Sequence, residues 1–316
     1  PVWDLWRSGA RLRGPLDPAH EGVRKVGALM LPALLGLSLS QLGFWITGSF
    51  ARGEGHLSAL RNAYNLTQAP IGIFAQASAI VLLPTISALA AQGRKAEFRD
   101  EIHFGIRRIL FLTVPASLWM AVLAEPLVSA IYQGGRYGAD DVRVAAGALW
   151  FYSLGTFAWS AQAILARGFY ALQDTRTPTV ITTIMVGLFA LLCATLPGTG
   201  LEYRGLALAL SIAGTANMAV FFAVLSRRTG GIDAPALLIA TLRIVAAAAA
   251  SALLGKMVLN VLWNGPENAT RFGSLAVVAG TGAVCLSLYA IACVLLKVPE
   301  LRTFRTLLRR RPAAAQ

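Results

Sequence analysis

The stretch SALRNAYNLTQAPIGIFAQASAIVLLPTISALAAQGRKAEF, from Ser58 to Phe98, decides the fold class of this chain. No charged residue lies between Leu66 and Ala91. At about 1.5 Å of rise per helical residue, this apolar run is long enough to cross a hydrocarbon layer of about 30 Å. It therefore predicts a membrane-spanning helix. Pro70 and Pro84 predict kinks, which helix bundles tolerate when neighbouring helices satisfy the freed backbone groups.

One face of this predicted helix is polar. Its members recur at three- and four-residue steps, which is the helical period: Ser58, Arg61, Asn65, Gln68 and Gly72. An arginine and two amides that faced lipid would be costly, so we expect the stripe to face a bundle interior or a water-filled cavity. The alternative is that Arg61 extends to the membrane interface while the amides bond neighbouring helices.

The composition of the whole chain supports a membrane protein. Of its 316 residues 56% are hydrophobic and only 14% are charged, whereas a water-soluble domain carries about 25% charged residues. Eight apolar runs are each long enough to span a membrane, and they cover approximately residues 25–50, 57–92, 104–132, 143–170, 178–197, 205–227, 234–262 and 272–297. The predicted fold class is an all-α polytopic membrane protein with about eight transmembrane helices. The short connections predict that consecutive helices are antiparallel neighbours.

The basic residues predict an orientation. The net charge of +13 comes from clusters between apolar runs rather than from one soluble basic face, which disfavours nucleic-acid binding. If the N-terminal segment is cytoplasmic, 21 Lys and Arg residues fall on the inner side and six on the outer side, with Lys256 inside a span. This bias predicts that both termini are cytoplasmic.

Catalytic and metal-binding patterns are missing from the sequence. None of the 15 Asp and Glu residues falls in the middle of a predicted span, which disfavours an ion-coupling carboxylate. The histidines are scattered, and Cys193, Cys285 and Cys293 lie in apolar runs without metal-ligand spacing. The adjacent pair Asp140 and Asp141 is interpreted as a helix start. We therefore predict a protein that is not an enzyme and has no catalytic residue, metal or cofactor.

Small and hydroxyl residues form further stripes on other predicted spans. Ser153, Thr156, Ser160, Ala163 and Arg167 follow one another at helical steps, and Ser211, Gly214, Thr215 and Met218 do the same. Such residues let helix backbones approach and bond across an interface, so packing is the favoured interpretation for each Ser or Thr.

Three segments resemble the MurJ/MviN family of lipid II flippases, within the larger group of multidrug and oligosaccharidyl-lipid exporters. They are GVRKVGALMLPALLGLSLSQL at Gly22–Leu42, QAPIGIFAQASAIVLLPTISALAAQGRKAEFR at Gln68–Arg99 and, most specifically, ARGFYALQDTRTP at Ala166–Pro178. In that family fourteen spans form two six-helix lobes followed by two extra helices. The chain resembles the part after the first lobe, which implies an amphipathic cytoplasmic linker at 1–24, a six-helix lobe at 25–227, two additional helices at 228–297 and a basic cytoplasmic tail at 298–316.

The resemblance also implies a function. A complete protein of this kind would carry lipid II, the lipid-linked peptidoglycan precursor, across the bacterial cytoplasmic membrane by alternating access. Its partners would be that lipid-linked oligosaccharide, membrane lipids and the missing N-terminal six-helix lobe, which the resemblance does not include in this sequence. The alternatives are an exporter of another polyprenyl-linked polysaccharide intermediate and a non-transporting membrane scaffold of cell-wall synthesis.

The candidate substrate-binding residues are Arg61, Asn65, Gln68, Gln41 and Arg167. Cations and amides of this kind can bind a pyrophosphate along a wet path through the membrane. For Arg167 the alternatives are extension to the interface or an ion pair with Asp174. A hydroxyl is expected to cap the helix that begins near Pro178.

The sequence departs from the family pattern at several polar positions. Ala63, Tyr64 and Asn65 stand where the family reads Ala-Asp-Arg, so Arg61, one turn earlier on the same face, is expected to supply the displaced charge. The first helix has Gly43 and Thr47 where polar residues are typical. Phe189 aligns with an asparagine. These departures predict that a sodium-like site is absent.

Overall fold

The computed structural model describes residues 42–51, 53, 55–231, 233–296 and 298–300. Regular structure in these residues is helical, and the one extended feature is an isolated bridge between Gly134 and Tyr137. The prediction of an all-α fold is confirmed. The predicted linker 1–24, the first part of the run 25–50 and most of the predicted tail lie outside the described residues.

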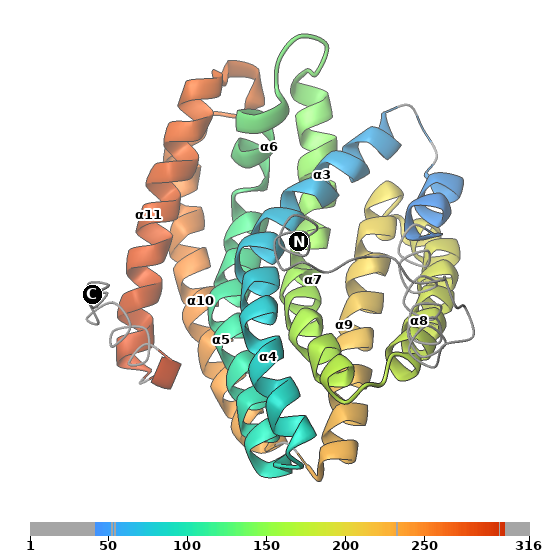
Figure 1. Cartoon of the computed structure of the whole chain (residues 1–316). Helices are drawn as coiled ribbons and strands as arrows, with labels where there is room; N and C mark the ends of the chain where they lie inside the picture. The colour runs from blue at the N-terminus through green and yellow to red at the C-terminus, as the bar shows by residue number, and fades with distance from the viewer. Residues whose placement is uncertain (1–41, 52, 54, 232, 297, 301–316) are drawn as a thin grey trace, which may run out of the picture.

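The helices run up and down the molecule in sequence order (Figure 1). After the helical residues 42–50 come α3 (His56–Pro70), the π-helix η1 (Ile71–Gln76), α4 (Ala77–Ala91), α5 (Lys95–Val122), α6 (Ala124–Tyr132), α7 (Ala139–Ala171), α8 (Arg176–Thr195), the 3₁₀ turn η2 (Leu196–Thr199), α9 (Tyr203–Thr229), α10 (Ala234–Leu262), the 3₁₀ turn η3 (Pro266–Asn268) and α11 (Arg271–Leu295).

Prolines interrupt two of the predicted runs. The predicted kink at Pro70 is confirmed, because this residue ends α3 where the π-helical turn begins and α3 is inclined to α4 (Figure 1). A proline cannot donate a backbone hydrogen bond, so the helical ladder has to adjust there. The apolar run 104–132 is not one helix, since α5 ends and α6 begins at Leu123. Pro126 explains the break, because its ring would clash with the carbonyl four residues earlier, that of Val122.

Six stretches of the described chain are long and apolar enough to cross a membrane by length and composition. They are His56–Ala91, Lys95–Val122, Arg176–Thr199, Tyr203–Thr229, Pro235–Leu262 and Arg271–Leu295. Helix α7, with 33 residues, is not among them. It lies at the centre of the bundle, packed against α3, α4, α5, α6 and α9. A helix surrounded by other helices needs no continuous lipid-facing surface, so it can carry more small and polar residues.

Small residues bring α7 and α9 together. The side chains of Ser153, Thr156 and Ser160 are buried, and each hydroxyl donates to the backbone carbonyl four residues earlier. On α9, the Ser211 hydroxyl donates across the interface to the carbonyl oxygen of Phe151 at 2.7 Å. The interpretation of these stripes as helix packing is therefore confirmed for these residues.

The last two helices pack on one side of the bundle. Helix α10 packs against α5 and α11 rather than against its predecessor α9, and α11 also contacts α6 (Figure 1). The expectation that every pair of consecutive helices is adjacent is therefore wrong at the α9–α10 step. At the end of α9, the Arg99 guanidinium of α5 donates to the carbonyl oxygen of Gly230 at 2.9 Å.

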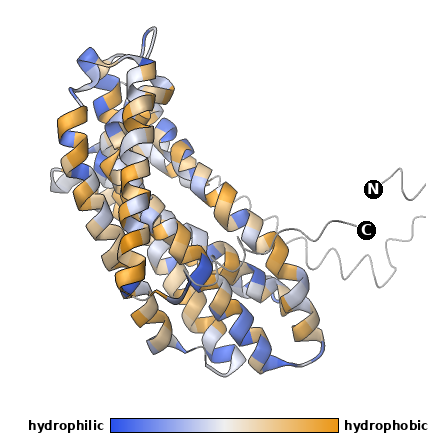
Figure 2. Ribbon diagram, turned by 90° about the vertical axis from the view of Figure 1, so that its left-hand side faces the viewer, coloured by the Kyte–Doolittle hydropathy of each residue, from blue (hydrophilic) through white to orange (hydrophobic). Residues whose placement is uncertain are grey.

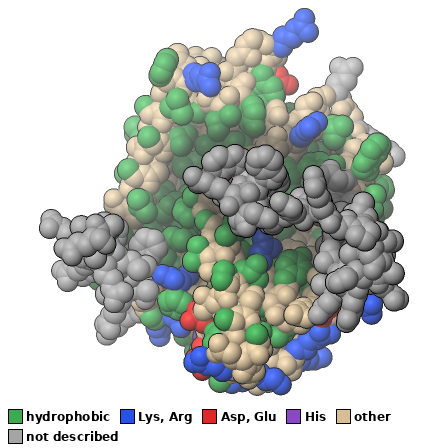
Figure 3. All heavy atoms as spheres, in the orientation of Figure 1, with side chains coloured by type: hydrophobic (Ala, Val, Ile, Leu, Met, Phe, Trp, Pro, Cys, Tyr) green, Lys and Arg blue, Asp and Glu red, His purple; other side chains and the backbone are tan. Residues whose placement is uncertain are grey.

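The surface is apolar along the helices and charged near their ends. Apolar residues cover most of the helix lengths in Figure 2, and large side chains such as Val261 (79% exposed) and Phe272 (84% exposed) face outward. Lys and Arg side chains gather at the lower end of the face shown in Figure 3. This distribution is what a membrane-embedded bundle requires, because apolar side chains on its outer surface contact lipid.

Candidate functional site

A cleft of about 380 Å³ opens between the helical residues 42–50, α3, α7 and α9. Its lining combines small, aromatic and polar side chains: Gly43, Phe44, Thr47, Leu57, Leu60, Arg61, Tyr64, Asn65, Tyr152 and Leu210. Two of the five candidate residues, Arg61 and Asn65, therefore line the same cleft. Arg61 contributes a cationic guanidinium to the cleft, and Asn65 contributes a neutral amide.

Helical geometry explains why these two side chains share the cleft. The stripe residues Ser58, Arg61, Asn65, Gln68 and Gly72 are all exposed, while Ala59, Leu60, Ala63, Leu66 and Thr67 are buried against the bundle. One face of α3 thus packs on α7 and the other stays open. The polar stripe therefore lies on the open face of α3, and its facing a water-filled cavity stays a prediction.

Aromatic rings form one wall of the cleft. The ring of Tyr64 lies 5.3 Å from that of Phe44, 5.8 Å from that of Tyr152 and 6.0 Å from that of Trp159, measured between centroids and with edge-on geometry. Edge-to-face contacts of this kind fix ring positions. The cleft therefore has an aromatic side beside its polar side. Sequence periodicity does not reveal this feature, because the rings come from three parts of the chain, namely residues 42–50, α3 and α7.

Two of the positions that depart from the family pattern have structural roles. The Thr47 side chain is buried, and its hydroxyl donates to the Gly43 carbonyl oxygen at 2.8 Å. Phe189 of α8 is buried in the apolar core that also contains Tyr152 and Leu206. The Phe189 side chain is thus part of the apolar core, and the Thr47 hydroxyl is hydrogen-bonded within its own helix.

The other three candidates do not line this cleft. Gln68 lies one turn beyond Asn65, and its side chain is exposed on the same face of α3. Gln41 lies outside the described residues. Arg167 lies near the C-terminal end of α7, where its guanidinium carbon is 5.8 Å from the centroid of the Tyr170 ring. The structure therefore brings Arg61 and Asn65 together with Gln68 nearby, and places Arg167 elsewhere.

The loop between α7 and α8 is held by Asp174. One carboxylate oxygen accepts from the Thr177 backbone N–H at 3.0 Å, and the other forms an ion pair with Arg228 at the end of α9. Burial raises the pKa of the Asp174 carboxyl, but hydrogen bonds from Thr177 and Arg228 outweigh burial and hold this pKa below its ordinary value of 3.8. The partner of Asp174 is thus Arg228 and not Arg167. A carboxylate, not the expected hydroxyl, caps α8.

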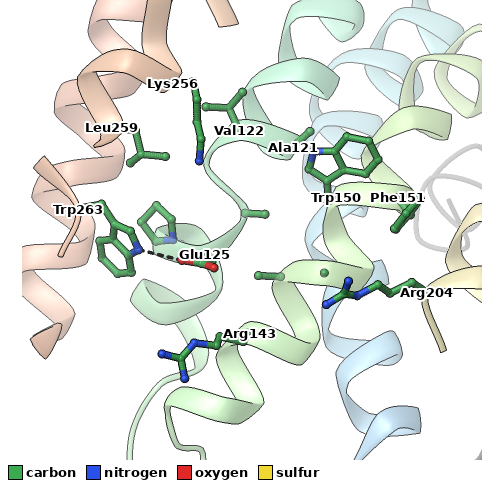
Figure 4. A pocket seen from close by; sticks show the side chains of 14 residues that line it. Ala121, Val122, Glu125, Arg143, Trp150, Phe151, Arg204, Lys256, Leu259 and Trp263 are labelled. Carbon is green, nitrogen blue, oxygen red and sulfur yellow. Dashed lines mark hydrogen bonds between the residues drawn. The ribbon is translucent and has the colours of Figure 1, made fainter. Parts of the chain in front are cut away.

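A second pocket, of about 410 Å³, lies between the α5–α6 junction, α7, α9 and α10 (Figure 4). Its charged side chains are Glu125, Arg143, Arg204 and Lys256, and Trp150 and Trp263 also line it. The sequence offered one signal for this site, namely Lys256 in the interior of the apolar run 234–262. The other charges lie near helix ends, where they resemble ordinary interfacial residues.

Metal-binding chemistry has no candidate in the described ranges. No group of three or more His, Cys, Asp or Glu side chains there is arranged to hold an ion. What the two pockets offer is electrostatic binding by arginine, lysine and amide groups beside aromatic rings. Such groups bind and position anions.

An outward-facing apolar bundle with a polar cleft on one side defines a class of protein, the polytopic helical membrane proteins. The solved structure titled "Lipid II flippase MurJ, inward closed conformation" shares this fold with a TM-score of 0.66 and 19% sequence identity, over 93% of this chain and 59% of that one. The family model described as "Lipid II flippase MurJ" matches residues 5–265. The chain belongs to the MurJ lipid II flippase family, as the resemblance of its motifs predicts.

Curated relatives agree with this assignment. The "Probable lipid II flippase MurJ" of Haemophilus influenzae is 34% identical over 217 residues, which are 66% of this chain and 42% of that protein. The "Lipid II flippase MurJ" of Burkholderia cenocepacia is 29% identical over 277 residues, which are 86% of this chain and 52% of that protein. The chain thus spans about half the length of these relatives.

Proposed function

We propose that this chain forms the C-terminal part of a transporter that flips lipid II across the bacterial cytoplasmic membrane. Membership of the MurJ family supports this substrate, and the share of the relatives that the chain covers fits one lobe with two additional helices. The remaining partner is a six-helix lobe that faces the cleft. No covalent bond changes in this process, so the protein acts without enzymatic chemistry.

The single observation that carries this proposal is the cleft that contains Arg61 and Asn65 on the open face of α3. A lipid-linked pyrophosphate has to bring its charged head through a region where an unpaired anion is costly. A guanidinium presents several N–H donors in a planar fork that matches phosphate oxygens. The Arg61 side chain supplies this group, and the Asn65 amide adds a neutral donor one turn away.

Arg61 is proposed to replace the arginine that the family pattern places at position 65. The two positions are four residues apart on one helix, so their side chains lie on the same face. Moving the cation by one turn changes its depth by about 6 Å and keeps it in the same cleft. This compensation predicts that the charge and its face matter more than its exact position.

Alternating access supplies the proposed mechanism. The lobe rocks against its partner so that the cleft opens to one side of the membrane and then to the other. The positive-inside bias supports an arrangement with both termini in the cytoplasm, and the Lys and Arg side chains gathered at the lower end in Figure 3 agree with it. Arg167 lies toward that end, where it would meet the substrate on entry.

The test uses the full-length protein that contains this chain, in cells depleted of their own flippase. The measurement is the fraction of lipid II accessible to a membrane-impermeant reagent outside the membrane. We expect Arg61→Ala to lower this fraction at least tenfold, Arg61→Lys to retain part of it, and the double variant Arg61→Ala/Asn65→Arg to recover most of it. The matched control is Arg136→Ala, an exposed arginine outside the cleft, which should leave transport unchanged.

The alternatives predict other patterns. If normal cell-wall growth persists without any lipid II transport by the wild type, the membrane scaffold is favoured. A different polyprenyl-linked glycan could instead be exposed outside the membrane by the wild type and lost in Arg61→Ala. The cleft would then bind the substrate as proposed, but the substrate would not be lipid II. Unchanged lipid II transport in Arg61→Ala would remove Arg61 from the mechanism.

A further inference from the structure

The pocket lined by Lys256, which we call the lysine pocket, brings together side chains from four parts of the chain. Glu125 comes from the start of α6, Arg143 and Trp150 come from α7, Arg204 comes from the start of α9, and Lys256 comes from α10. It lies apart from the cleft of Arg61, with which it shares no lining residue. Transport through that cleft therefore leaves this cluster of charges unexplained.

Two of its charged groups are already engaged. The Arg143 guanidinium forms ion pairs with Asp140, at 3.0 Å, and with Glu267. The Glu125 carboxylate accepts a hydrogen bond from the Trp263 indole N–H at 3.0 Å. These contacts account for Arg143 and for one oxygen of Glu125, and they leave Arg204 and Lys256 as the cations that can accept a ligand.

Arg204 is held toward the pocket by the close approach of α9 to α7. A side chain at Gly147 would place its Cβ 2.9 Å from Arg204 Nε, so the missing side chain gives the guanidinium room beside α7. Arg204 Nε also donates to the Tyr203 hydroxyl at 3.1 Å. In the described residues neither Arg204 nor Lys256 forms an ion pair with a carboxylate, and in Figure 4 both point into the pocket from opposite sides.

The surroundings of Lys256 are lipid-facing. On α10 the neighbouring side chains Leu253 and Met257 are 69% and 67% exposed, as is expected of residues that contact acyl chains. Trp263 follows two turns later near the helix end, and Trp150 lines the opposite wall. Tryptophans at this depth mark the boundary between acyl chains and headgroups. The pocket is thus open to a molecule that has an apolar tail and an anionic head.

We propose that the lysine pocket binds the phosphate of a membrane phospholipid between the Lys256 ammonium and the Arg204 guanidinium, with the acyl chains along α10. The orientation predicted from the basic residues places this lipid in the outer leaflet. A bound lipid there would brace α10 against α7 and α9, which α10 does not otherwise pack against closely.

The test measures lipid retained by the full chain after purification in mild detergent, by mass spectrometry of the intact complex. The probes are phosphatidylglycerol and diacylglycerol, which share acyl chains but differ in the phosphate. We expect phosphatidylglycerol to bind at least tenfold more tightly than diacylglycerol, because hydrogen bonds to charged groups are the stronger ones. Lys256→Gln/Arg204→Gln should abolish this preference, Lys256→Arg should keep it, and the control Arg271→Gln, an exposed arginine at the same end of the bundle, should keep it.

Three outcomes would overturn the proposal. Equal binding of the two lipids would show that the phosphate is not recognised. Loss of the preference in Arg271→Gln as much as in the double variant would indicate general surface charge. Displacement of the lipid by millimolar inorganic phosphate would show that the pocket takes a soluble anion. A melting temperature measured for every variant separates loss of binding from loss of folding, and the retained preference of Lys256→Arg remains decisive if the double variant is unstable.

Discussion

Gly155 on α7 lies so close to Ser211 on α9 that a Cβ added to Gly155 would stand 2.8 Å from the Cα of Ser211. Backbone atoms on both helices define this contact, so no side-chain rotation can relieve a clash. The same pair of helices carries the hydrogen bond from the Ser211 hydroxyl to the Phe151 carbonyl oxygen. The glycine therefore sets the distance between the central helix and α9.

Replacing Gly155 should destabilise the bundle. Gly155→Val forces α7 and α9 apart, and overpacking of this kind costs about 1–3 kcal/mol. The measurement is the apparent melting temperature of the purified protein in detergent. Gly187→Ala on α8 is the matched control, since a Cβ there meets no atom within 4 Å; this change should leave the melting temperature equal or slightly higher. Equal melting temperatures for Gly155→Val and the wild type would contradict the close packing.

A buried ion pair fixes the segment that follows α11 to α5. Arg107 Nε donates to Glu300 Oε1 at 2.5 Å, and the two side chains are 23% and 5% exposed. Removing one partner leaves the other charge poorly solvated, so Glu300→Ala should lower the free energy of unfolding by about 2–4 kcal/mol. The exposed pair Arg94–Glu97, with both side chains about half exposed, is the comparison. Breaking it with Glu97→Ala should cost less than about 1 kcal/mol. Similar costs for both changes would show that burial does not strengthen the Arg107–Glu300 pair.

The ion pair of Asp174 predicts a pH dependence. Because its folded-state pKa lies below the ordinary value of 3.8, the carboxylate contributes stability that is fully present above pH 3.8 and is lost as the pH falls through the lower folded value. Asp174→Asn removes the ion pair with Arg228 and should cost about 1 kcal/mol at neutral pH. The difference in melting temperature between wild type and variant should be constant above about pH 4 and should shrink as the pH falls below 3.8. A difference that stays constant as the pH falls well below 3.8 would mean that the charge of Asp174 does not matter.

Sequence periodicity predicted the features that belong to single helices. The polar stripe of α3 was predictable because the exposure of Arg61 and Asn65 follows from helical geometry once one face is apolar. Pro126 also indicates the break between α5 and α6 at Leu123, but the apolar run continues across this position, so hydrophobicity alone does not show the break. Whether Arg61 and Asn65 bind substrate stays a prediction, since it depends on a partner lobe and a ligand.

Features that join distant helices were not predictable in this way. Lys256 lines one pocket with Arg204 and Glu125 because α10 packs against α5 instead of α9, and a short connection between helices does not specify that arrangement. The wall of Tyr64, Tyr152 and Trp159 likewise depends on how α3 sits on α7. Local patterns state which face of a helix is buried, but not which helix covers it.

The aromatic wall of the cleft gives the last prediction. Tyr64→Phe keeps the ring contacts with Phe44, Tyr152 and Trp159, so the melting temperature should change little. Tyr64→Ala removes all three contacts, each worth about 0.5–1.5 kcal/mol, and should lower the melting temperature by several degrees. Because Tyr64 lines the cleft beside Arg61, the alanine variant should also loosen the position of α3 and increase hydrogen exchange of the α3 backbone amides. If Tyr64→Phe and Tyr64→Ala lower the melting temperature equally, the Tyr64 hydroxyl holds α3 in place, and the ring contacts do not.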